Sequence, residues 1–356
     1  MGDVISVVVT GAGAPGIAGT IYSLNNNPDD MKFRIISTDV KSDPVGRYLA
    51  SEFYTIPPPE DEEYIRCIKD IATKENARVI IPQTTREIVL LSQHLEEFRE
   101  IDVSVIVSDY SSLKRANDKY LIIKECEKAE VPYPEYFLID NENDFLSALD
   151  NLGYPDKKVI VKPRFSSGLR GLRIISNETL SMKEFLEEKP TGLNIDLDSI
   201  LKIFRNGPFP EILVTQYLPG DEYSVDVFRN ANGTVAIPRN RKDIRSGISF
   251  DTEIELRDDI IKYSVKLGES LDLKYCFGFQ FKMDENNVPR ILESNPRIQG
   301  TMVASTYAGF NMIYYSVKEA LGNSVEISDI EICDNTHIKR YWGAIAIKDA
   351  NYSGKI

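Results

Sequence analysis

The sequence predicts a multidomain α/β protein whose C-terminal half is of the α+β type. Strands alternate with helices over residues 1–112, which is typical of a parallel sheet. Farther along, apolar strands are joined by short turns rich in glycine or asparagine, which is typical of hairpins. A chain of 356 residues is long enough for two or three domains, and we place them at residues 1–112, 113–211 and 212–356.

The chain opens with a strand, a glycine turn and a helix, at Ile5–Thr10, Gly11–Gly16 (GAGAPG) and Ile17–Leu24. This order begins a doubly wound unit and suggests a dinucleotide-binding turn. Pro15 disturbs the usual spacing of such a turn. Asp39 follows the next strand, where a ribose ligand would be placed, but an acidic residue at the end of a strand is a common coincidence. The alternative is that the turn is structural or contacts a small acidic substrate through its amides.

The next elements are expected as strands at residues 34–38, 78–82 and 103–108 and helices at residues 63–74 and 86–98. A polar stretch, Asp109–Arg115, then marks the exit from the first domain. A helix follows at Lys119–Ala129, with Asn117 or Asp118 as its N-cap. Lys119 lies where the helix dipole disfavours a cation, so a nearby anion would explain it; the alternative is an ordinary exposed lysine.

Residues Val159–Ile175, VIVKPRFSSGLRGLRII, are expected to form two strands around a loop, with Lys162 at the end of the first strand. The loop contains two serines, two glycines and two arginines, namely Ser166, Ser167, Gly168, Gly171, Arg164 and Arg170. Such a loop can close over a ligand and offer its amides to phosphate. A plain hairpin would not need these residue types together, so we interpret the loop as a phosphate-covering flap.

A strand-to-strand junction follows a stretch at residues 191–210 that is expected to be irregular. Ile212–Leu218 is an apolar strand that ends at Pro219 and Gly220, and a second strand runs from residue 223 to residue 228. Such a junction is typical of a hinge. The backbone of residues 216–218 can bind an adenine edge, and Glu222 is placed to accept hydrogen bonds from ribose hydroxyls.

Phe277–Arg297, FGFQFKMDENNVPRILESNPR, is expected to be a hairpin with one apolar face. If Asn286 and Asn287 form a two-residue loop, Gln280 faces Glu293 across the two strands. Asn295 shares the face of Glu293, which gathers two amide oxygens and a carboxylate. The candidate ligands are Gln280, Glu293 and Asn295, a set of oxygen donors that suits magnesium. Arg297 adds a planar cation for phosphate.

Composition limits the classes of partner. A net charge of −13 and a pI near 4.9 argue against nucleic acid or an anionic membrane as the main partner. The four cysteines show no metal-ligand spacing and are interpreted as packing residues in a reducing compartment. The sequence therefore predicts a cytoplasmic protein that acts on small molecules, and it leaves a homo-oligomer open. We expect no catalytic role for His94 or His337.

The order of these parts resembles the ATP-grasp superfamily over essentially the whole chain. The resemblance is strongest to the ATP-grasp unit of the carbamoyl phosphate synthase large subunit and its stand-alone relatives. It implies an ATP-grasp fold with a Rossmann-like pre-ATP-grasp domain, a lid subdomain and a C-terminal metal-bearing subdomain. It also implies that the GAGAPG turn is not a dinucleotide site, which lowers the case for Asp39.

The resemblance assigns roles residue by residue. Lys119 and Lys162 would grip ATP phosphates, and residues 165–171 would form the glycine-rich flap. Gln216, Tyr217 and Leu218 resemble the adenine hinge, and Glu222 resembles the ribose ligand. Gln280, Glu293 and Asn295 match magnesium ligands, with Glu293 bridging two ions and Mn²⁺ as an alternative metal, and Arg297 matches the phosphate-binding arginine that follows them.

Residues 237–249 carry four cations and are expected to form a loop. In the resembling family this loop borders the acceptor site, so Arg239 and Arg241 are candidates to hold a carboxylate or the transferred phosphate. Carbamoyl phosphate synthase has a histidine nearby. Its absence from this stretch argues against that enzyme's bicarbonate chemistry.

The predicted activity is that of an ATP-dependent carboxylate-amine ligase. A carboxylate attacks the γ-phosphate of ATP, and an amine then attacks the acyl phosphate, with Lys162, Arg239 and Arg297 as the residues closest to the chemistry. No serine, cysteine or histidine is placed as a nucleophile. The alternatives are a carbamoyl-phosphate synthase-like enzyme that uses bicarbonate and ammonia, a non-catalytic ATP-binding module, and, least favoured, a dehydrogenase.

Overall fold

The computed structural model describes residues 4–166, 168–179, 181–187, 192–328, 330–349 and 351–355. The chain divides into two compact units. Unit 1 comprises Met1–Ala116, Tyr223–Gln280 and Ser294–Ile356, and unit 2 comprises Asn117–Glu222 and Phe281–Glu293. The chain thus leaves unit 1 and returns to it twice. The domain boundaries expected near residues 112 and 211 stay predictions.

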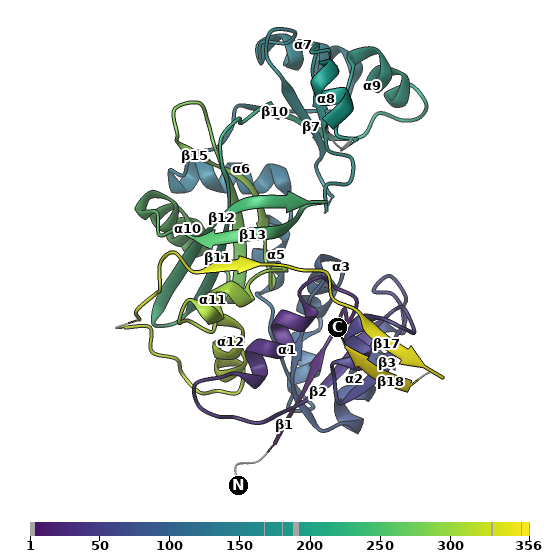
Figure 1. The fold of residues 1–356 in the computed structure, drawn as a ribbon, viewed down its shortest axis with the longest axis vertical. Coiled ribbons are helices and arrows are strands. Elements are labelled where there is room, and N and C mark those ends of the chain that lie inside the picture. Colours follow the sequence, from purple (N-terminus) through teal and green to yellow (C-terminus); the bar gives the residue numbers. More distant parts are fainter. Residues whose placement is uncertain are drawn as a thin grey trace. The chain divides into compact units, whose positions relative to one another are not determined.

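Unit 1 begins with the predicted parallel sheet (Figure 1). Its strands are β1 (Ile5–Val9), β2 (Phe33–Asp39), β3 (Glu52–Thr55), β4 (Ala77–Ile81) and β5 (Ser104–Val105), in the order β3-β2-β1-β4-β5 and all parallel. Its helical segments are α1 (Ile17–Asn25), η1 (Val45–Tyr48), α2 (Tyr64–Lys74), α3 (Thr85–Gln93), α4 (Leu95–Arg99) and α5 (Tyr110–Ala116). The expected alternation of strands and helices is confirmed. The single helix expected at residues 86–98 is broken at His94, and the polar exit segment is helical.

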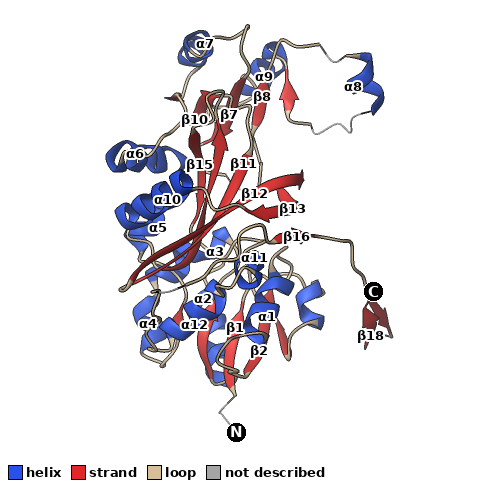
Figure 2. Ribbon diagram, turned by 60° about the vertical axis from the view of Figure 1, so that its left-hand side comes forward, coloured by secondary structure: helices blue, strands red, loops and turns tan. Residues whose placement is uncertain are grey.

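A second, antiparallel sheet carries most of the C-terminal half (Figure 2). Its strands are β11 (Glu222–Asn230), β12 (Gly233–Arg245), β13 (Ile248–Ile254), β14 (Tyr275–Met283), β15 (Pro289–Asn295) and β16 (His337–Lys339), in the order β15-β14-β11-β12-β13-β16. Helices α10 (Asp258–Leu271), α11 (Val303–Tyr307) and α12 (Met312–Ala320) accompany it, and β17 (Ile345–Lys348) pairs with β18 (Asn351–Lys355). One apolar core joins the parallel sheet to the part of the antiparallel sheet that belongs to unit 1, because Val7, Ile17, Phe228, Ile237 and Ile313 belong to the same buried cluster.

Unit 2 is built on a five-stranded sheet. Its elements are α6 (Lys119–Ala129), β6 (Tyr136–Ile139), α7 (Glu142–Asn151), β7 (Val159–Pro163), β8 (Arg173–Ile175), α8 (Met182–Glu187), β9 (Asn194–Ile195), α9 (Leu197–Phe204) and β10 (Ile212–Gln216), with the strand order β6-β10-β7-β8-β9. Its core is separate and centres on Phe145, Val161 and Val214. The strands predicted around the flap are confirmed as β7 and β8.

Two stretches expected to be irregular or looped are regular. Residues 191–210 contain β9 and α9, and Asp196 caps α9 by accepting a hydrogen bond from the Ser199 amide at 2.8 Å. Residues 237–249 lie in β12, the following turn and the start of β13, so the expected loop is wrong. A loop was expected because of the cations in this stretch, but Arg239 and Arg241 lie on a strand and their side chains are buried.

The turn between β14 and β15 also differs from the expectation. The Asp284 amide donates to the Val288 carbonyl, and the Asn287 amide donates to the Asp284 carbonyl, each at 3.0 Å. Asn287 takes a φ of 60°, as the extra residue of such a bulged turn does. The loop therefore has three residues instead of two, and the register that set Gln280 opposite Glu293 is wrong at the turn. The buried apolar face of β14 is confirmed.

The helices of the described residues include none long and apolar enough to cross a membrane. Of the four cysteines, Cys126 and Cys276 are buried, as packing residues are. Cys67 is only partly buried and Cys333 is exposed, so the packing interpretation is wrong for Cys333.

Candidate active site

Lys162 lies on β7, the middle strand of the unit 2 sheet, where it pairs in register with Leu213 of β10. Its side chain is only 6% exposed, and its Nζ donates to the Leu292 carbonyl at 3.2 Å. Burial lowers the pKa of Lys162 to about 8, against the opposing attraction of Glu293. A buried ammonium group that donates only to a neutral oxygen is stabilised when an anion takes the place of that oxygen.

Lys119 occupies the first turn of α6, as predicted. The Asp118 side chain caps the helix by accepting hydrogen bonds from the Tyr120 and Leu121 amides, which settles the choice of N-cap. Lys119 Nζ donates to the carbonyl and to the hydroxyl of Ser166. Burial lowers the pKa of Lys119, and the charges of Glu293 and Asp118 oppose that shift. The lysine is therefore not an ordinary exposed one: its ammonium group holds the flap.

The flap has the backbone that its glycines predict. Gly168 and Gly171 both take positive φ, 63° and 75°, and a Cβ on Gly171 would lie 2.5 Å from Pro163 Cγ. Ser167 lies outside the described residues. Arg164, expected to add charge for phosphate, instead donates to Asp118 at 2.7–3.0 Å and to Glu211 at 3.1 Å. Arg164 therefore fastens the flap to the start of α6.

The hinge segment runs alongside β14 within unit 2. The Gly220 amide donates to the Met283 carbonyl at 3.0 Å, and the Met283 amide donates to the Asp221 carbonyl at 2.9 Å. A Cβ on Gly220 would lie 2.6 Å from Met283 Cβ, so this approach requires glycine. Glu222 Oε2 lies 3.9 Å from Lys282 Nζ. The predicted adenine-binding residues, Gln216, Tyr217 and Leu218, form the end of β10 and the segment that follows it.

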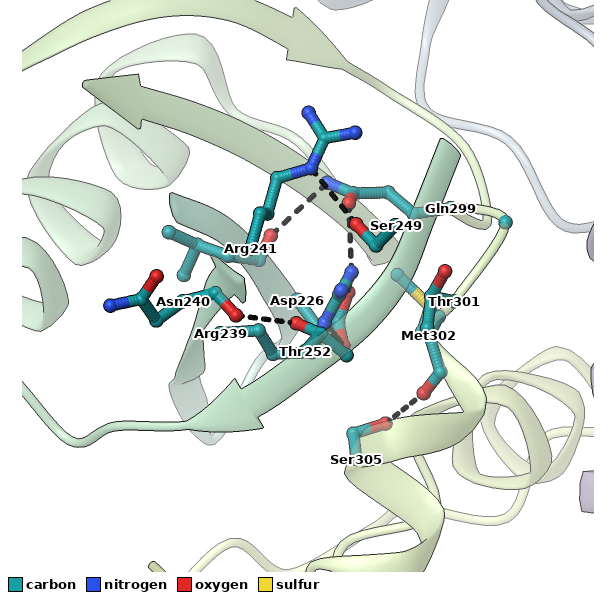
Figure 3. A network of polar contacts seen from close by, with 12 residues as sticks. Asp226, Arg239, Asn240, Arg241, Ser249, Thr252, Gln299, Thr301, Met302 and Ser305 are labelled. Atoms are coloured by element: carbon teal, nitrogen blue, oxygen red, sulfur yellow. Dashed lines mark hydrogen bonds and ion pairs between the residues drawn. The ribbon is translucent and has the colours of Figure 1, made fainter. Parts of the chain in front are cut away.

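Arg239 belongs to unit 1 and sits in a buried ion pair on β12 (Figure 3). Its Nε and Nη2 donate to the two oxygens of Asp226 at 2.7 and 2.8 Å, and Nη2 also donates to Gln299 Oε1 at 3.1 Å. Arg239 is 1% exposed and Asp226 is fully buried. The Arg239 Nη1 atom is buried and has no hydrogen-bond partner. Burial raises the pKa of the Asp226 carboxyl group, and the charge of Arg239 opposes that shift.

A glycine opens the path by which Gln299 reaches Arg239. A Cβ on Gly278 of β14 would lie 1.5 Å from Gln299 Nε2, so the amide crosses the strand only because residue 278 has no side chain. Gln299 Nε2 then donates to the Val225 carbonyl at 3.3 Å. Arg241, the other candidate in this stretch, donates to Ser249 Oγ at 2.9 Å and to the Gly247 carbonyl at 2.6 Å, which orders the β12–β13 turn.

The predicted metal ligands lie on adjacent strands, Gln280 on β14 and Glu293 and Asn295 on β15. Within the described residues no group of three histidine, cysteine or acidic side chains could hold a metal ion. One carboxylate with amide oxygens nevertheless fits magnesium, which commonly takes one or two protein carboxylates and completes its shell with waters and phosphate oxygens. Arg297 donates to Thr85 Oγ1 at 2.9 Å and to the Ile298 carbonyl at 2.8 Å, both in unit 1.

Sequence reasoning missed Arg340, which follows β16. Its Nη1 donates to the Pro15 carbonyl at 3.2 Å, and its Nη2 donates to the Gly300 carbonyl and to Thr301 Oγ1. The pKa of Arg340 is lowered by burial and then by the charge of Arg239. An isolated arginine near the end of the chain carries no spacing signal, so only the fold could have identified it.

The amides of the GAGAPG turn donate hydrogen bonds to other groups of the same chain. The amides of Ala12, Gly13 and Ala14 donate to the Thr38 carbonyl, to Asp39 Oδ2 and to the Gly11 carbonyl, at 2.7–2.9 Å. Asp39 Oδ1 also accepts from the Lys41 amide at 2.9 Å. These three amides are therefore not offered to an acidic substrate, and the Asp39 carboxylate holds the turn. The structural interpretation of the turn is favoured over a ribose ligand at Asp39.

The fold matches solved structures of ATP-grasp enzymes. N5-carboxyaminoimidazole synthetase from Staphylococcus aureus complexed with ADP aligns with a TM-score of 0.69 at 19% identity, over 96% of this chain and 82% of that one. Biotin carboxylase from Campylobacter jejuni aligns with a TM-score of 0.70 at 16% identity, over 94% of this chain and 74% of that one. The predicted ATP-grasp fold is confirmed.

The family comparison agrees. Residues 208–340 match a family model described as ATP-grasp in the biosynthetic pathway with Ter operon, and residues 8–106 match the PylC-like N-terminal domain. The carbamoyl phosphate synthase large chain of Clostridium acetobutylicum is 22% identical over 315 residues, which are 85% of this chain and 26% of that protein. Residues 208–340 are therefore similar to an ATP-grasp family, and residues 8–106 are similar to the N-terminal domain of PylC-like proteins. The chain spans about a quarter of the curated relatives it matches, and their enzyme names support the prediction of an enzyme.

Proposed function

We propose that the protein is an ATP-dependent carboxylate-amine ligase that forms an acyl phosphate and releases ADP and phosphate. The observation that carries the proposal is the lysine pair of unit 2. Both ammonium groups are buried or partly buried, both have lowered pKa values, and both donate to neutral oxygens. Such groups gain free energy when a polyphosphate replaces those weak acceptors, because charge-assisted hydrogen bonds are stronger than neutral ones.

The flap suits the same ligand. Lys119 holds the Ser166 carbonyl and hydroxyl, so an incoming phosphate would exchange with Ser166 for the same ammonium group. The positive φ values of Gly168 and Gly171 fit a loop whose amides can turn toward phosphate oxygens. Closing such a flap would exclude water from an acyl phosphate, which hydrolyses readily.

The remaining roles follow from charge and donor type. Gln280, Glu293 and Asn295 would hold magnesium, which when bound neutralises phosphate charge, and a solved relative contains MgADP and bicarbonate. Arg297 would bind the transferred phosphate. The hinge residues at 216–218 would receive adenine, and Glu222 would accept hydrogen bonds from ribose. Two small molecules, a carboxylic acid and an amine, are the proposed substrates.

The test is phosphate release from ATP and magnesium over a matrix of carboxylic acids and amines. We expect release in particular wells of the matrix, and loss of that release in the Lys162→Met variant. Release that persists unchanged in Lys162→Met would contradict the role of the lysine pair. ATP binding without turnover in every well would instead favour a non-catalytic ATP-binding module.

Carbamoyl-phosphate chemistry is the second candidate, because the matched curated relatives carry that name. The same matrix includes a well with bicarbonate and ammonia. Phosphate release confined to that well would replace the ligase proposal with the carbamoyl one.

A further inference from the structure

The carboxylate of Asp118 precedes, in the chain, one of the two lysines that are proposed to bind nucleotide phosphates. It caps α6 by accepting hydrogen bonds from the Tyr120 and Leu121 amides at 2.9 and 3.2 Å, and the residue is only 3% exposed. Burial lowers the pKa of Lys119, and the charges of Glu293 and Asp118 oppose that shift. A buried carboxylate whose charge acts on Lys119 would also repel an incoming phosphate group, because charges interact strongly where water is largely excluded.

Arg164 neutralises this carboxylate. Its Nε donates to Asp118 Oδ1 at 3.0 Å and to Oδ2 at 2.9 Å, and its Nη2 donates to Oδ2 at 2.7 Å. The third nitrogen, Nη1, donates to Glu211 at 3.1 Å, but the Glu211 side chain is 51% exposed, so solvent screens this second ion pair. The charge of Arg164 is therefore matched mainly by Asp118.

Two aromatic rings fix the guanidinium group in this position. The Arg164 Cζ atom lies 5.2 Å from the ring centroid of Tyr120 and 5.2 Å from that of Phe165. Tyr120 belongs to α6 and Phe165 belongs to the flap, so both elements contribute a ring. Such contacts hold a planar cation in one orientation. They therefore favour a fixed role of Arg164 at Asp118 over direct binding of phosphate.

We propose that Arg164 is a positioning residue for nucleotide binding, which neutralises Asp118 so that phosphate oxygens can approach Lys119 without repulsion. Asp118 is needed there because it caps α6 and so places Lys119 in the first turn of that helix. Without Arg164, the unmatched carboxylate would also attract the Lys119 ammonium group away from the nucleotide. This inference rests on the proposed function for the identity of the anion, and it adds Arg164 and Asp118 to that function.

The first test uses the nucleotide-free protein and compares Arg164→Met with the double variant Arg164→Met and Asp118→Asn. Both lack the guanidinium group, and asparagine is also a good N-cap, so the two proteins differ in the charge at residue 118. Each is treated with acetic anhydride, and the acetylation rate of Lys119 is read by peptide mass spectrometry. We expect the rate to be about threefold lower in Arg164→Met, because an unmatched carboxylate favours the protonated amine, which does not react.

Lys183, whose side chain is 80% exposed, is the internal control for this test and should react at the same rate in both variants. Equal acetylation rates at Lys119 in the two variants would overturn the proposal, because the charge of Asp118 would then not act on the lysine. A difference at Lys119 that is matched at Lys183 would overturn it as well, since it would show a change in the whole protein.

The second test measures the binding of magnesium ATP by isothermal titration calorimetry. Arg164→Met should raise the Kd about 10-fold, a loss similar to that of one charge-assisted hydrogen bond. Adding Asp118→Asn should return the Kd to within about threefold of the original value, although the guanidinium group is still absent. Glu211→Gln removes the exposed partner of Arg164, so it is the matched control and should leave the Kd unchanged.

The double variant decides between this role and the alternatives. If it binds ATP as weakly as Arg164→Met, then Arg164 itself contacts phosphate or only anchors the flap, and the proposal is overturned. A Kd that Arg164→Met leaves unchanged would overturn it too. If the original protein binds no nucleotide, the proposed function fails, and the acetylation rates of Lys119 alone then decide whether Arg164 neutralises Asp118.

Discussion

The lysine pair of unit 2 and the buried ion pair of Arg239 with Asp226 in unit 1 handle positive charge differently. Lys119 and Lys162 have lowered pKa values and hold carbonyl or hydroxyl oxygens that a ligand can replace. Arg239 is fixed by a two-oxygen ion pair in the core of unit 1. A lysine can lose its proton when it is buried, whereas an arginine keeps its charge at all ordinary pH values and must be matched by an anion.

The two pairs differ in whether a ligand can replace the groups to which the cations donate. A nucleotide site must bind ATP and release ADP in each turnover, so weak, replaceable partners suit its cations. A cation in the core needs a permanent partner, because a buried charge that loses its counter-charge is strongly destabilising. The predictions below test the two halves of this contrast.

The largest effect is expected at Glu293, the carboxylate of the proposed metal set and the opposing charge to both lysines. Glu293→Gln should lower ATP turnover by about 10⁴-fold, equivalent to about 5 kcal/mol of transition-state stabilisation. ADP release is measured, with the far-ultraviolet circular dichroism spectrum as the check on folding. Glu285→Gln, in the exposed turn of the same hairpin, is the matched control. Near-normal ADP release from folded Glu293→Gln would remove the metal assignment.

Asp226→Asn tests the buried ion pair between Asp226 and Arg239. The variant leaves Arg239 buried without its counter-charge, so the free energy of unfolding should fall by about 4 kcal/mol, measured by urea denaturation. Asp272→Asn breaks the exposed pair with Arg229 and should cost less than about 1 kcal/mol. The double variant Asp226→Leu with Arg239→Met should recover part of the loss. Equal effects of Asp226→Asn and Asp272→Asn would show that burial does not distinguish the pairs.

Lys162→Met tests the lysine pair through the pH dependence of the free energy of unfolding. The folded-state pKa of Lys162 is about 8, below an unfolded value of about 10.4, so its charge destabilises the nucleotide-free fold. The penalty is fully present below pH 8 and is relieved as pH rises from 8 toward 10.4. The variant should therefore raise the free energy of unfolding by about 3 kcal/mol at pH 7, and this gain should shrink above pH 8.

The control for this effect is Lys183→Met, because the Lys183 side chain is 80% exposed and its removal should change stability little at any pH. Urea denaturation of the three proteins from pH 6 to pH 10 gives the comparison. A gain from Lys162→Met that does not vary with pH would mean that packing, and not the lysine charge, accounts for it.

The smallest effect is expected at Gly278. A methyl group there would overlap Gln299 Nε2, so Gly278→Ala should cost about 2 kcal/mol in the free energy of unfolding. Gly207→Ala, where a Cβ meets nothing within 4 Å, is the matched control. Adding Gln299→Ala to Gly278→Ala should restore most of the loss. If the double variant is no more stable than Gly278→Ala, Gln299 is not the obstacle.

The sequence by itself determined the ATP-grasp fold, whereas the roles that it suggested for the nucleotide-site residues stay predictions. These signals are local: the alternation in β14, the Asp118 cap before Lys119 and the glycines of the flap all act within a few residues. The same reasoning failed where a local signal was ambiguous. Four cations at residues 237–249 suggested a solvated loop, and the asparagine pair at residues 286 and 287 suggested a two-residue turn.

Only the tertiary structure decided which groups contact Arg239 and Arg340. Asp226, Arg239, Gln299, Pro15 and Arg340 come from five separate stretches of the chain, and no spacing in the sequence relates them. Whether Arg239 faces solvent or Asp226 depends on the packing of β11 against β12, and whether Gln299 can reach Arg239 depends on the missing side chain of Gly278. Burial and charge balance are properties of the assembled core, which is why a cationic stretch could be located from the sequence but its partners could not.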